Sequence, residues 1–456
     1  MRVSGSFVVS GAVSALVVLG AGASGCTCDG PVDMMEVDAA RGPRVDADLD
    51  APGEDTAAEG QDAFAIREDA NLDTGPSTGF DSGPGSALDC RHSHAFGEDF
   101  WYLARDSDDS VPSFTSVASR AGNLVGVYST TDGAGARHLE AFRYRIGVGG
   151  MDPTVLAEGA GGALPTVVAS SDGFWVAYTV GSDIRVARYG DDLSARGPAA
   201  TVATEAVTTP PRIATTGTGG YVVWVVGNTI RGRPLDAAGA PTGMATTLVT
   251  SARPVQQVAI QRVGPGADLA LAWADDDRPH LARFSGGAVG TAEFVGGDPG
   301  IFTSIDMGGQ SAGTMEGLPL AGAAVYDLND GGARDIVFRV VNDAIVPSFP
   351  AATVASGGDH AWSGSVEPFL SGYALAYRAS LPALDRTALR IGYLDRDGCR
   401  LGSVTDRYII GLIDSESGAV PQLAVDEGTM LIVWSDERAG EYFDYWAAVM
   451  VCTERS

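Results

Sequence analysis

The feature that most constrains the fold of this chain is a hairpin unit that recurs along it. Each unit contains a short β-rich run that ends in an aromatic residue, and seven such runs occur from residue 95 onward. The runs end at Tyr128, Tyr178, Trp224, Trp273, Tyr326, Tyr377 and Trp434, spaced 46 to 57 residues apart. Self-similarity at such a spacing is typical of repeat architectures, in which each repeat is one supersecondary unit.

Other short extended segments flank each run. Those before the runs include PTVVA (165–169), PRIA (211–214) and PQLA (421–424). A third segment follows each run, such as IRVARY (184–189), and a fourth follows in six units, such as ATVAT (200–204). Gly, Asp and Pro separate the segments, and no stretch has helical periodicity. This pattern predicts four-stranded antiparallel sheets.

Units of this length, repeated in series, predict an all-β, seven-bladed β-propeller. The seventh unit stops one strand too soon, because the stretch from Val433 onward supplies its second and third strands and no fourth follows. An unassigned strand-like piece, FWYLA (100–104), precedes the first unit. We expect it to form the outer strand of the last blade, which closes the ring and removes an exposed sheet edge.

The cysteines bear on this closure. Antiparallel pairing of the closing strand brings Cys90 near Cys452, and we predict a disulfide between them; a Cys399–Cys452 bridge and a free pair are the alternatives. A bridge between the two ends of the domain would stabilise it by roughly 4–5 kcal/mol on chain-entropy grounds. The partners of Cys28 and Cys399 are left open.

Residues 1–25 have the features of an export signal. Arg2 provides a positive start, an apolar stretch follows, and small residues lead to Cys26. The stretch is too short for a stable membrane span. Small residues directly before a cysteine resemble the bacterial lipobox, which implies lipidation of Cys26. An ordinary secretory signal cut near Ala23 is the alternative, and Thr27 after the cysteine favours the outer membrane over the inner one.

The segment that follows, residues 26–89, is acidic and poor in aromatic residues. From Thr27 to Asp89 it has 16 acidic residues and three Arg, a net charge of −13. Such a stretch cannot bury enough apolar surface to offset the entropy of ordering, so we expect a disordered linker. The predicted organisation is therefore a signal peptide (1–25), a lipid-anchored linker (26–89) and a propeller (90–456).

The charge balance excludes one class of partner. The formal net charge is −28, whereas nucleic acids and anionic lipid surfaces require a basic face. We expect no nucleic-acid partner and attachment to the membrane only through the lipid. The chain is expected to be a monomer.

The hairpin units resemble those of secreted bacterial β-propellers, and the signal and linker resemble those of surface lipoproteins that carry such domains. Sialidases share the general shape, but their repeated Asp boxes are missing here. The stretch DLNDGGARDIVF (327–338) resembles the calcium loop of FG-GAP propellers. That resemblance implies a Ca²⁺ site at Asp327, Asn329 and Asp335; a hairpin turn rich in Gly and Asp is the alternative. No other cofactor is expected.

Catalytic and metal-binding motifs are few. GxSxG occurs at residues 75–79 and 309–313, in the linker and in a glycine-rich turn, neither of which provides the strand and helix of a nucleophile elbow. Cys90, His92 and His94 alternate as metal ligands on one strand face would, but a disulfide at Cys90 would preclude this.

The loop face is the remaining candidate site. In a propeller, the turns between second and third strands open on the same face as the links between blades. We predict an acidic ligand face there with one aromatic platform, made of Asp276, Asp327, Asn329, Asp330, Asp359, His360, Trp362 and Asp436. Aspartates that merely serve as turn residues are the alternative. The expected function is non-catalytic binding or scaffolding of a protein, peptide or carbohydrate at the cell envelope, periplasmic or surface-facing. A polysaccharide hydrolase or lyase is the alternative.

Overall fold

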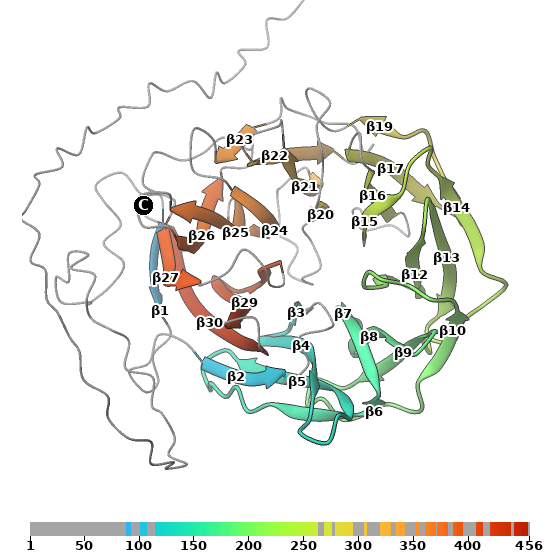
Figure 1. The fold of residues 1–456 in the computed structure, drawn as a ribbon, viewed down its shortest axis with the longest axis horizontal. Helices are drawn as coiled ribbons and strands as arrows, with labels where there is room; N and C mark the ends of the chain where they lie inside the picture. Colours follow the sequence, from blue (N-terminus) through green and yellow to red (C-terminus); the bar gives the residue numbers. More distant parts are fainter. Residues whose placement is uncertain are drawn as a thin grey trace, which may run out of the picture. The chain divides into compact units, whose positions relative to one another are not determined.

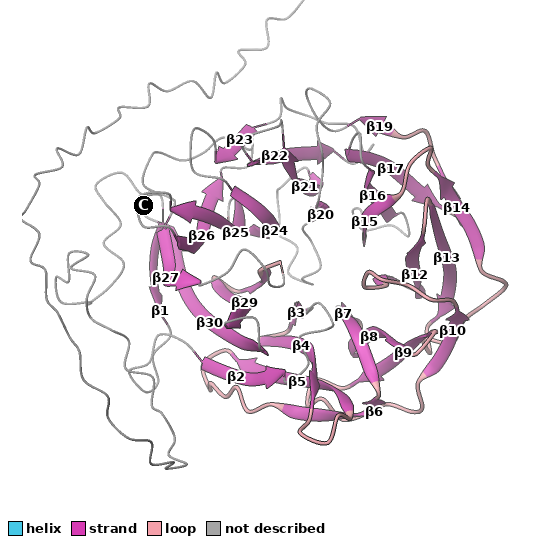
Figure 2. Ribbon diagram, in the orientation of Figure 1, coloured by secondary structure: helices cyan, strands magenta, loops and turns pink. Residues whose placement is uncertain are grey.

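The computed structural model describes residues 88–92, 101–106, 115–262, 269–275, 279–294, 305–307, 320–329, 334–342, 352–355, 361–370, 372–381, 386–394, 407–413, 420–438 and 442–454. All of them belong to the second of the chain's two units, Val37–Ser456. The predicted signal peptide, Cys26 and the predicted linker as far as residue 87 lie outside the described residues. The elements in the described ranges are all β-strands, as predicted (Figure 2).

Six sheets are built from strands that are consecutive in the chain, and all their strand pairs are antiparallel. The first two contain β3 (Thr115–Arg120), β4 (Asn123–Thr131), β5 (Arg137–Arg145) and β6 (Thr154–Ala160), then β7 (Gly162–Ser170), β8 (Gly173–Val180), β9 (Asp183–Tyr189) and β10 (Ala200–Thr204). The third contains β11 (Arg212–Thr216), β12 (Gly219–Val226), β13 (Thr229–Asp236) and β14 (Thr246–Thr250). The fourth contains β15 (Val255–Arg262), β16 (Leu269–Asp275), β17 (Pro279–Ser285), β18 (Ala288–Val289) and β19 (Glu293–Phe294). The last two contain β20 (Ile305–Met307), β21 (Leu320–Asn329), β22 (Arg334–Asn342) and β23 (Ala352–Ala355), then β24 (Ala361–Phe369), β25 (Gly372–Leu381), β26 (Arg386–Leu394) and β27 (Arg407–Ile413).

A further sheet, here called the composite sheet, joins both ends of the domain. It contains β28 (Gln422–Asp426), β29 (Thr429–Arg438), β30 (Tyr442–Glu454), β1 (Leu88–His92) and β2 (Trp101–Asp106). Strand β30 is 13 residues long, so both N-terminal strands fit end to end along its outer edge. Strand β2 pairs with residues 443–447 of β30, as predicted for FWYLA, and β1 pairs with residues 450–454.

The count of seven sequential blades therefore needs a correction. Six blades are formed from consecutive strands, whereas the seventh unit does not make a blade of its own. Its three strands are completed by β1 and β2, which lie more than 300 residues earlier in the sequence. A unit that ends with its third strand leaves an open edge, and pairing with a distant strand satisfies the hydrogen-bonding groups of that edge.

The innermost strands of these sheets form a closed cycle. Each contacts the innermost strand of the next sheet in the order β3, β7, β11, β15, β20, β24 and β28, and β28 contacts β3 (Figure 1). The middle strands are buried along their whole length, as in β4 and β16, because each sheet packs between two others. Outer strands such as β14 are largely exposed.

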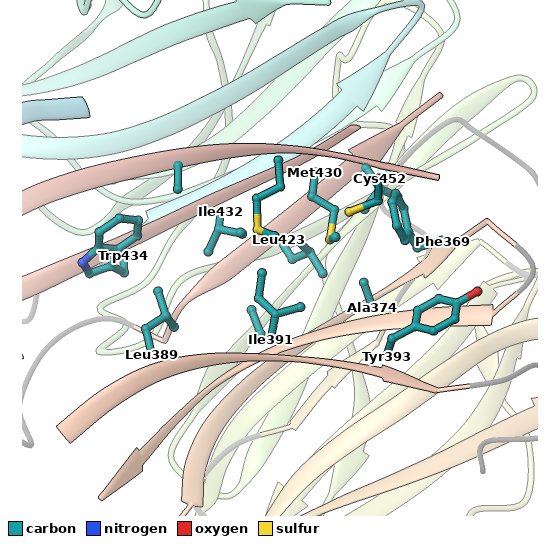
Figure 3. Packing of buried hydrophobic residues seen from close by; sticks show 14 residues of the cluster. Phe369, Ala374, Leu389, Ile391, Tyr393, Leu423, Met430, Ile432, Trp434 and Cys452 are labelled. Carbon is teal, nitrogen blue, oxygen red and sulfur yellow. The ribbon is translucent and has the colours of Figure 1, made fainter. Parts of the chain in front are cut away.

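The hydrophobic core lies between neighbouring sheets. Figure 3 shows one such layer, in which Leu389, Ile391 and Tyr393 of β26 face Leu423 of β28 and Met430 of β29. Another layer joins the composite sheet to the first consecutive blade and includes Tyr128 and Tyr445. Burial of these apolar surfaces is the main term that holds the sheets together.

Two equivalent tight turns lie side by side at this junction. Ala121 and Gly122 connect β3 to β4 with φ of 48° and 75°, and Glu427 and Gly428 connect β28 to β29 with φ of 46° and 77°. Positive φ at both central residues matches the twist of a two-residue hairpin and makes glycine favourable at the second position. The Gly122 N–H donates to Asp426 Oδ2 at 2.7 Å, which ties the two turns together.

Candidate functional site

Equivalent residues of the innermost strands surround the centre of the domain. In each sheet, one inner-strand residue pairs in register with the residue that precedes the repeat aromatic. These residues, here called the axial ring, are Ser116, Thr166, Arg212, Ala259, Asp306, Ser365 and Gln422. In each sheet the partner lies near the middle of the second strand, so the axial ring lies about midway along these hairpins.

Small polar members of the axial ring connect neighbouring sheets. Ser116 Oγ accepts a hydrogen bond from the Val167 N–H at 3.0 Å, and Ser365 Oγ accepts one from the Leu423 N–H at 3.2 Å. Asp306 Oδ2 accepts a longer one from Val366 N at 3.4 Å. Each bond satisfies a backbone donor of an inner strand that has no strand neighbour on that side, which explains polar residues in this interior.

A second set of bonds lies three residues further along the inner strands. Ser119 donates to the Val425 carbonyl of the composite sheet, and Thr215 Oγ1 donates to the Ala169 carbonyl at 2.7 Å. In both cases a hydroxyl reaches the preceding sheet, whereas the axial-ring bonds engage the following one. The inner strands are therefore connected in both directions around the cycle.

Arg212 departs from this pattern. It retains partial solvent exposure, yet burial lowers the pKa of its guanidinium, with the Asp306 carboxylate acting in the opposite direction. Both observations fit a group that is largely surrounded by protein and still touches solvent. Within the described residues no direct ion pair within 4.0 Å joins Arg212 to Asp306. Ala259, the smallest member of the axial ring, stands between them.

A second polar layer lies opposite the repeat aromatics, on the third strands. Five of its members are Glu140, Arg185, Arg231, His280 and Arg390. Glu140 accepts hydrogen bonds from Tyr128 Oη at 3.1 Å and Thr130 Oγ1 at 2.6 Å. Burial, followed by the Glu140 charge, raises the pKa of Tyr128 far above its ordinary value, so Tyr128 stays a neutral donor.

Glu205 has a comparable structural role beside the third consecutive blade. Its carboxylate accepts a hydrogen bond from Trp224 Nε1 at 2.8 Å and forms an ion pair with Arg231. Trp224 is fully buried, so its indole N–H requires an acceptor inside the protein. The interaction holds the link before β11 against β12 and β13.

Asp275 is the centre of a third cluster. Asp275 Oδ2 accepts a hydrogen bond from Ser251 Oγ at 2.6 Å and lies 3.2 Å from His280 Nε2. The His280 ring stacks on Trp273, with centroids 5.0 Å apart and 13° between the planes. In a catalytic triad the serine contacts the histidine, whereas here serine and histidine both contact the carboxylate. This cluster is therefore arranged as a brace, not as an activated nucleophile.

The predicted ligand-face residues divide into two groups. Asp276, Asp330, Asp359 and His360 lie outside the described residues. The others were expected in turns and links, but the structure places their backbone within strands: Asp327 and Asn329 in β21, Trp362 in β24 and Asp436 in β29. The strands continue past the repeat aromatic, because the hairpin ladder stays paired up to a shorter turn.

The residues of the predicted calcium loop occupy both strands of one hairpin. Asp327 pairs in register with Ile336 and Asn329 with Arg334, whereas Asp335 pairs with Leu328. Directly paired residues share a sheet face and successive residues alternate, so the register puts Asp335 on the face opposite to that of Asp327 and Asn329. Among the side chains that the structure describes, no group of three His, Cys, Asp or Glu could hold a metal ion.

The register also bears on the predicted disulfide. Cys90 of β1 pairs with Cys452 of β30, and Cys452 is disulfide-bonded. In the part of the chain that is described, no helix is long and apolar enough to cross a membrane.

Sequence reasoning missed the axial ring. A signal was present, since Thr166, Arg212 and Gln422 each follow a proline at the start of the inner-strand segments PTVVA, PRIA and PQLA. Only the register of all the sheets reveals that Asp306 and Ala259 hold the same position. Nothing in the sequence around Asp306 marks it as a neighbour of Arg212.

No family model matches the chain, and no curated protein matches it. Among solved structures, a protein of unknown function from Dyadobacter fermentans is 13% identical, with a TM-score of 0.46 over 81% of this chain and 100% of that one. The Dos1 propeller is 9% identical, with a TM-score of 0.44 over 76% and 95%. The propeller domain of the Trilobed protease from Pyrococcus furiosus, which has an open velcro topology, is 7% identical, with a TM-score of 0.43 over 74% and 95%. These likenesses concern the propeller fold alone.

Proposed function

We propose that this protein is a non-catalytic binding or scaffolding propeller that presents its loop face at the cell envelope. One observation carries the proposal: the described carboxylates near this face are engaged as structural acceptors. Glu140, Glu205 and Asp275 each accept from at least two side chains of their own surroundings. A general base must be within reach of a substrate proton, and these groups are already occupied.

In our proposal the composite sheet acts as the seventh blade, and the closed ring that results supports the loop face. Its outer edge is paired with β1 and β2, and its inner strand contacts both neighbours in the cycle. We propose Cys90 as the partner of Cys452, because the two are directly paired in register. A closed, cross-linked ring is a rigid support on which loops can hold a binding surface.

The proposal includes the cellular location of the protein. Lipidation of Cys26, with residues 27–89 as a flexible acidic tether, would hold the propeller away from an outer membrane in the periplasm or at the surface. The loop-face residues Asp276, Asp327, Asn329, Asp330, Asp359, His360, Trp362 and Asp436 would contact a protein, peptide or carbohydrate there. Calcium at Asp327, Asn329 and Asp335 stays a prediction that a Ca²⁺ titration of the full chain tests.

Two measurements separate the binding proposal from its alternative, a hydrolase or lyase acting on polysaccharide. The purified full chain is sedimented with isolated outer membrane, peptidoglycan and surface polysaccharide. The same polysaccharides are assayed for new reducing ends and for the unsaturated ends that a lyase leaves. We expect saturable co-sedimentation with one fraction and no new ends. Turnover of a polysaccharide, or binding to none of the fractions, contradicts the proposal.

A further inference from the structure

Two strands complete the outer edge of the composite sheet, and the second of them is held by its side chains. Leu103 of β2 packs in the core that joins the composite sheet to the first consecutive blade. The ring centroid of Trp101 lies 6.2 Å from that of Tyr144, and Asp106 Oδ1 accepts a hydrogen bond from the Thr131 N–H at 3.0 Å. Strand β2 is therefore fixed to a neighbouring blade as well as to β30.

Strand β1 is held differently. It pairs with residues 450–454 at the end of β30, and among the described strands none pairs with its other edge. The predicted tether joins the domain at Leu88, so tension in the tether acts on the first pair of this short ladder, Leu88 with Glu454. A ladder pulled at its end opens one pair at a time, and terminal segments open at little cost in free energy. Without a further attachment, tension would therefore peel β1 away first.

The backbone at Cys452 shows that a cross-link fits at this place. The Cys452 N–H donates to the Gly428 carbonyl at 2.7 Å, on the side of Cys452 that faces away from β1. Because the N–H and C=O of one strand residue point to the same side, Cys90 and Cys452 form a non-hydrogen-bonded pair, with Cα atoms about 4.5 Å apart. A disulfide requires about 4.4–6.8 Å, so the register supports Cys90 as the partner of Cys452.

A pull on Cys452 acts on a different kind of strand. Strand β30 lies inside the sheet, because residues 442–451 pair with β29 on one side while β1 and β2 pair with β30 on the other. Tyr445, Ala448 and Val449 of β30 are fully buried. Removal of β30 would break ladders on both sides and expose the core to water, so it requires unfolding of the domain and not a local opening.

We propose that the bridge between Cys90 and Cys452 is a mechanical clamp. It transfers tension from the tether to the interior strand β30, so that only Leu88 and Asp89 can be peeled from the edge of the sheet. Strand β2, which completes the ring, is then shielded from the tension.

The biological use of the clamp rests on the membrane attachment proposed above. The clamp itself requires no ligand and no lipid. Co-sedimentation tests the binding function, whereas the experiment below tests only the resistance to tension, so the two proposals fail separately.

The test is single-molecule force spectroscopy on the full chain. One handle is attached in the tether just before Leu88. The other replaces Met244, which is 84% exposed and lies between β13 and β14 of the third consecutive blade. An azide-bearing amino acid carries the handle at each site, so that no cysteine is added.

We expect C90S to show an early extension step, at a force below that of the main unfolding event, which the oxidised wild type lacks. The step ends where β2 begins, at Trp101, eleven residues after Cys90. The gain in contour length is therefore up to about 40 Å. Because C90S also loses stability, folded wild type reduced with dithiothreitol provides a second sample. Its reduction is confirmed by a thiol count, and it should show the same step.

Two control variants separate the clamp from general stability. C399S leaves the clamp in place and should behave as the wild type does. Y445A weakens the junction beside β30 but keeps the bridge, so the domain should unfold at a lower force without the early step. An early step in oxidised wild type, C399S or Y445A would overturn the proposal. The absence of the step from C90S or from the reduced wild type would overturn it as well.

Discussion

The ring of Tyr445 stacks on the ring of Tyr128, with centroids 4.8 Å apart and 28° between the planes. The two residues belong to β30 and β4, so the contact crosses the junction between the composite sheet and the first consecutive blade. The Tyr445 hydroxyl also donates to the Ser129 carbonyl at 2.8 Å. Stacking and hydrogen bond together connect strands that are 316 residues apart in the chain.

We expect Y445F to destabilise the protein by about 1–2 kcal/mol, because the buried Ser129 carbonyl loses its donor while the ring stays in place. Y445A should cost about 3–5 kcal/mol, since it also leaves a cavity in the junction. Urea unfolding of the full chain measures both. Y102F is the control, because Tyr102 is 50% exposed, and it should have little effect. Equal costs for Y445F and Y102F would contradict the role of the hydroxyl bond.

Buried tyrosines make the fold sensitive to alkali. Burial raises the pKa of Tyr178 to about 12, and it raises the pKa of Tyr128 and Tyr445 further. In the unfolded chain a tyrosine has a pKa of about 10. Between these values the unfolded state loses protons that the folded state keeps, so stability is complete below pH 10 and falls as pH rises above it.

The measurement for this alkaline transition is urea unfolding at a series of pH values, with tyrosinate absorbance as a second signal. We expect the urea concentration at the unfolding midpoint to decrease as the pH is raised from about 10 to 12. The tyrosinate absorbance should rise over the same pH range in which the protein unfolds. Y178F should make the fall less steep in this range. Full titration of all tyrosines in a chain that stays folded would be inconsistent with the burial of these hydroxyls.

We expect Glu205 to stabilise the fold by accepting from two donors, Trp224 and Arg231. E205A leaves the buried Trp224 indole N–H and the Arg231 guanidinium without this acceptor, which should destabilise by about 1–3 kcal/mol. E205Q keeps an oxygen acceptor for Trp224 and should cost less. Chemical unfolding followed by tryptophan fluorescence tests both variants. A double-mutant cycle with R231Q separates the ion pair from the indole bond, and a coupling energy of zero would refute the paired arrangement.

The axial-ring serines are expected to stabilise the junctions between blades. S116A and S365A each leave a backbone N–H of the next inner strand without its acceptor, at a cost of about 1–3 kcal/mol. S171A is a matched control, because Ser171 is exposed and only its carbonyl accepts a bond, from Arg120. Hydrogen exchange at Val167 and Leu423 should accelerate in the respective variant. Unchanged protection of these two amides would argue against the interblade bonds.

The proposed disulfide can be tested by mass. Peptide mapping without reduction should recover Cys90 linked to Cys452, and the same preparation reports whether Cys26 carries lipid. C90S, C452S and the double variant should lose the same stability, roughly 5 kcal/mol on chain-entropy grounds. C399S is the control. Recovery of a Cys399–Cys452 peptide instead would assign the bridge to the alternative pair.

Some site residues cannot be placed from the sequence, because local composition does not fix where a strand ends and a turn begins. Trp362 was expected in a link and Asp436 in a turn, whereas β24 and β29 include them. Asp, Gly and Ser lower the local preference for strand, but the ladder with a neighbouring strand continues through them when each backbone group finds a partner. A prediction from local composition therefore ends these strands before the residues at which they end in the structure.

The sequence by itself determined the repeat, the strand class and the segment that completes the last unit. The spacing of the aromatic runs and the alternation of apolar strands with Gly and Asp turns are local properties of the sequence. They predict that FWYLA completes the last unit and that Cys90 lies beside Cys452. Only the tertiary structure decided that Arg212, Ala259 and Asp306 share one ring. These residues lie about a repeat apart, and their relationship depends on the register of three separate sheets and on the cycle of inner strands. Such contacts are set by packing between sheets, which no short stretch of sequence encodes.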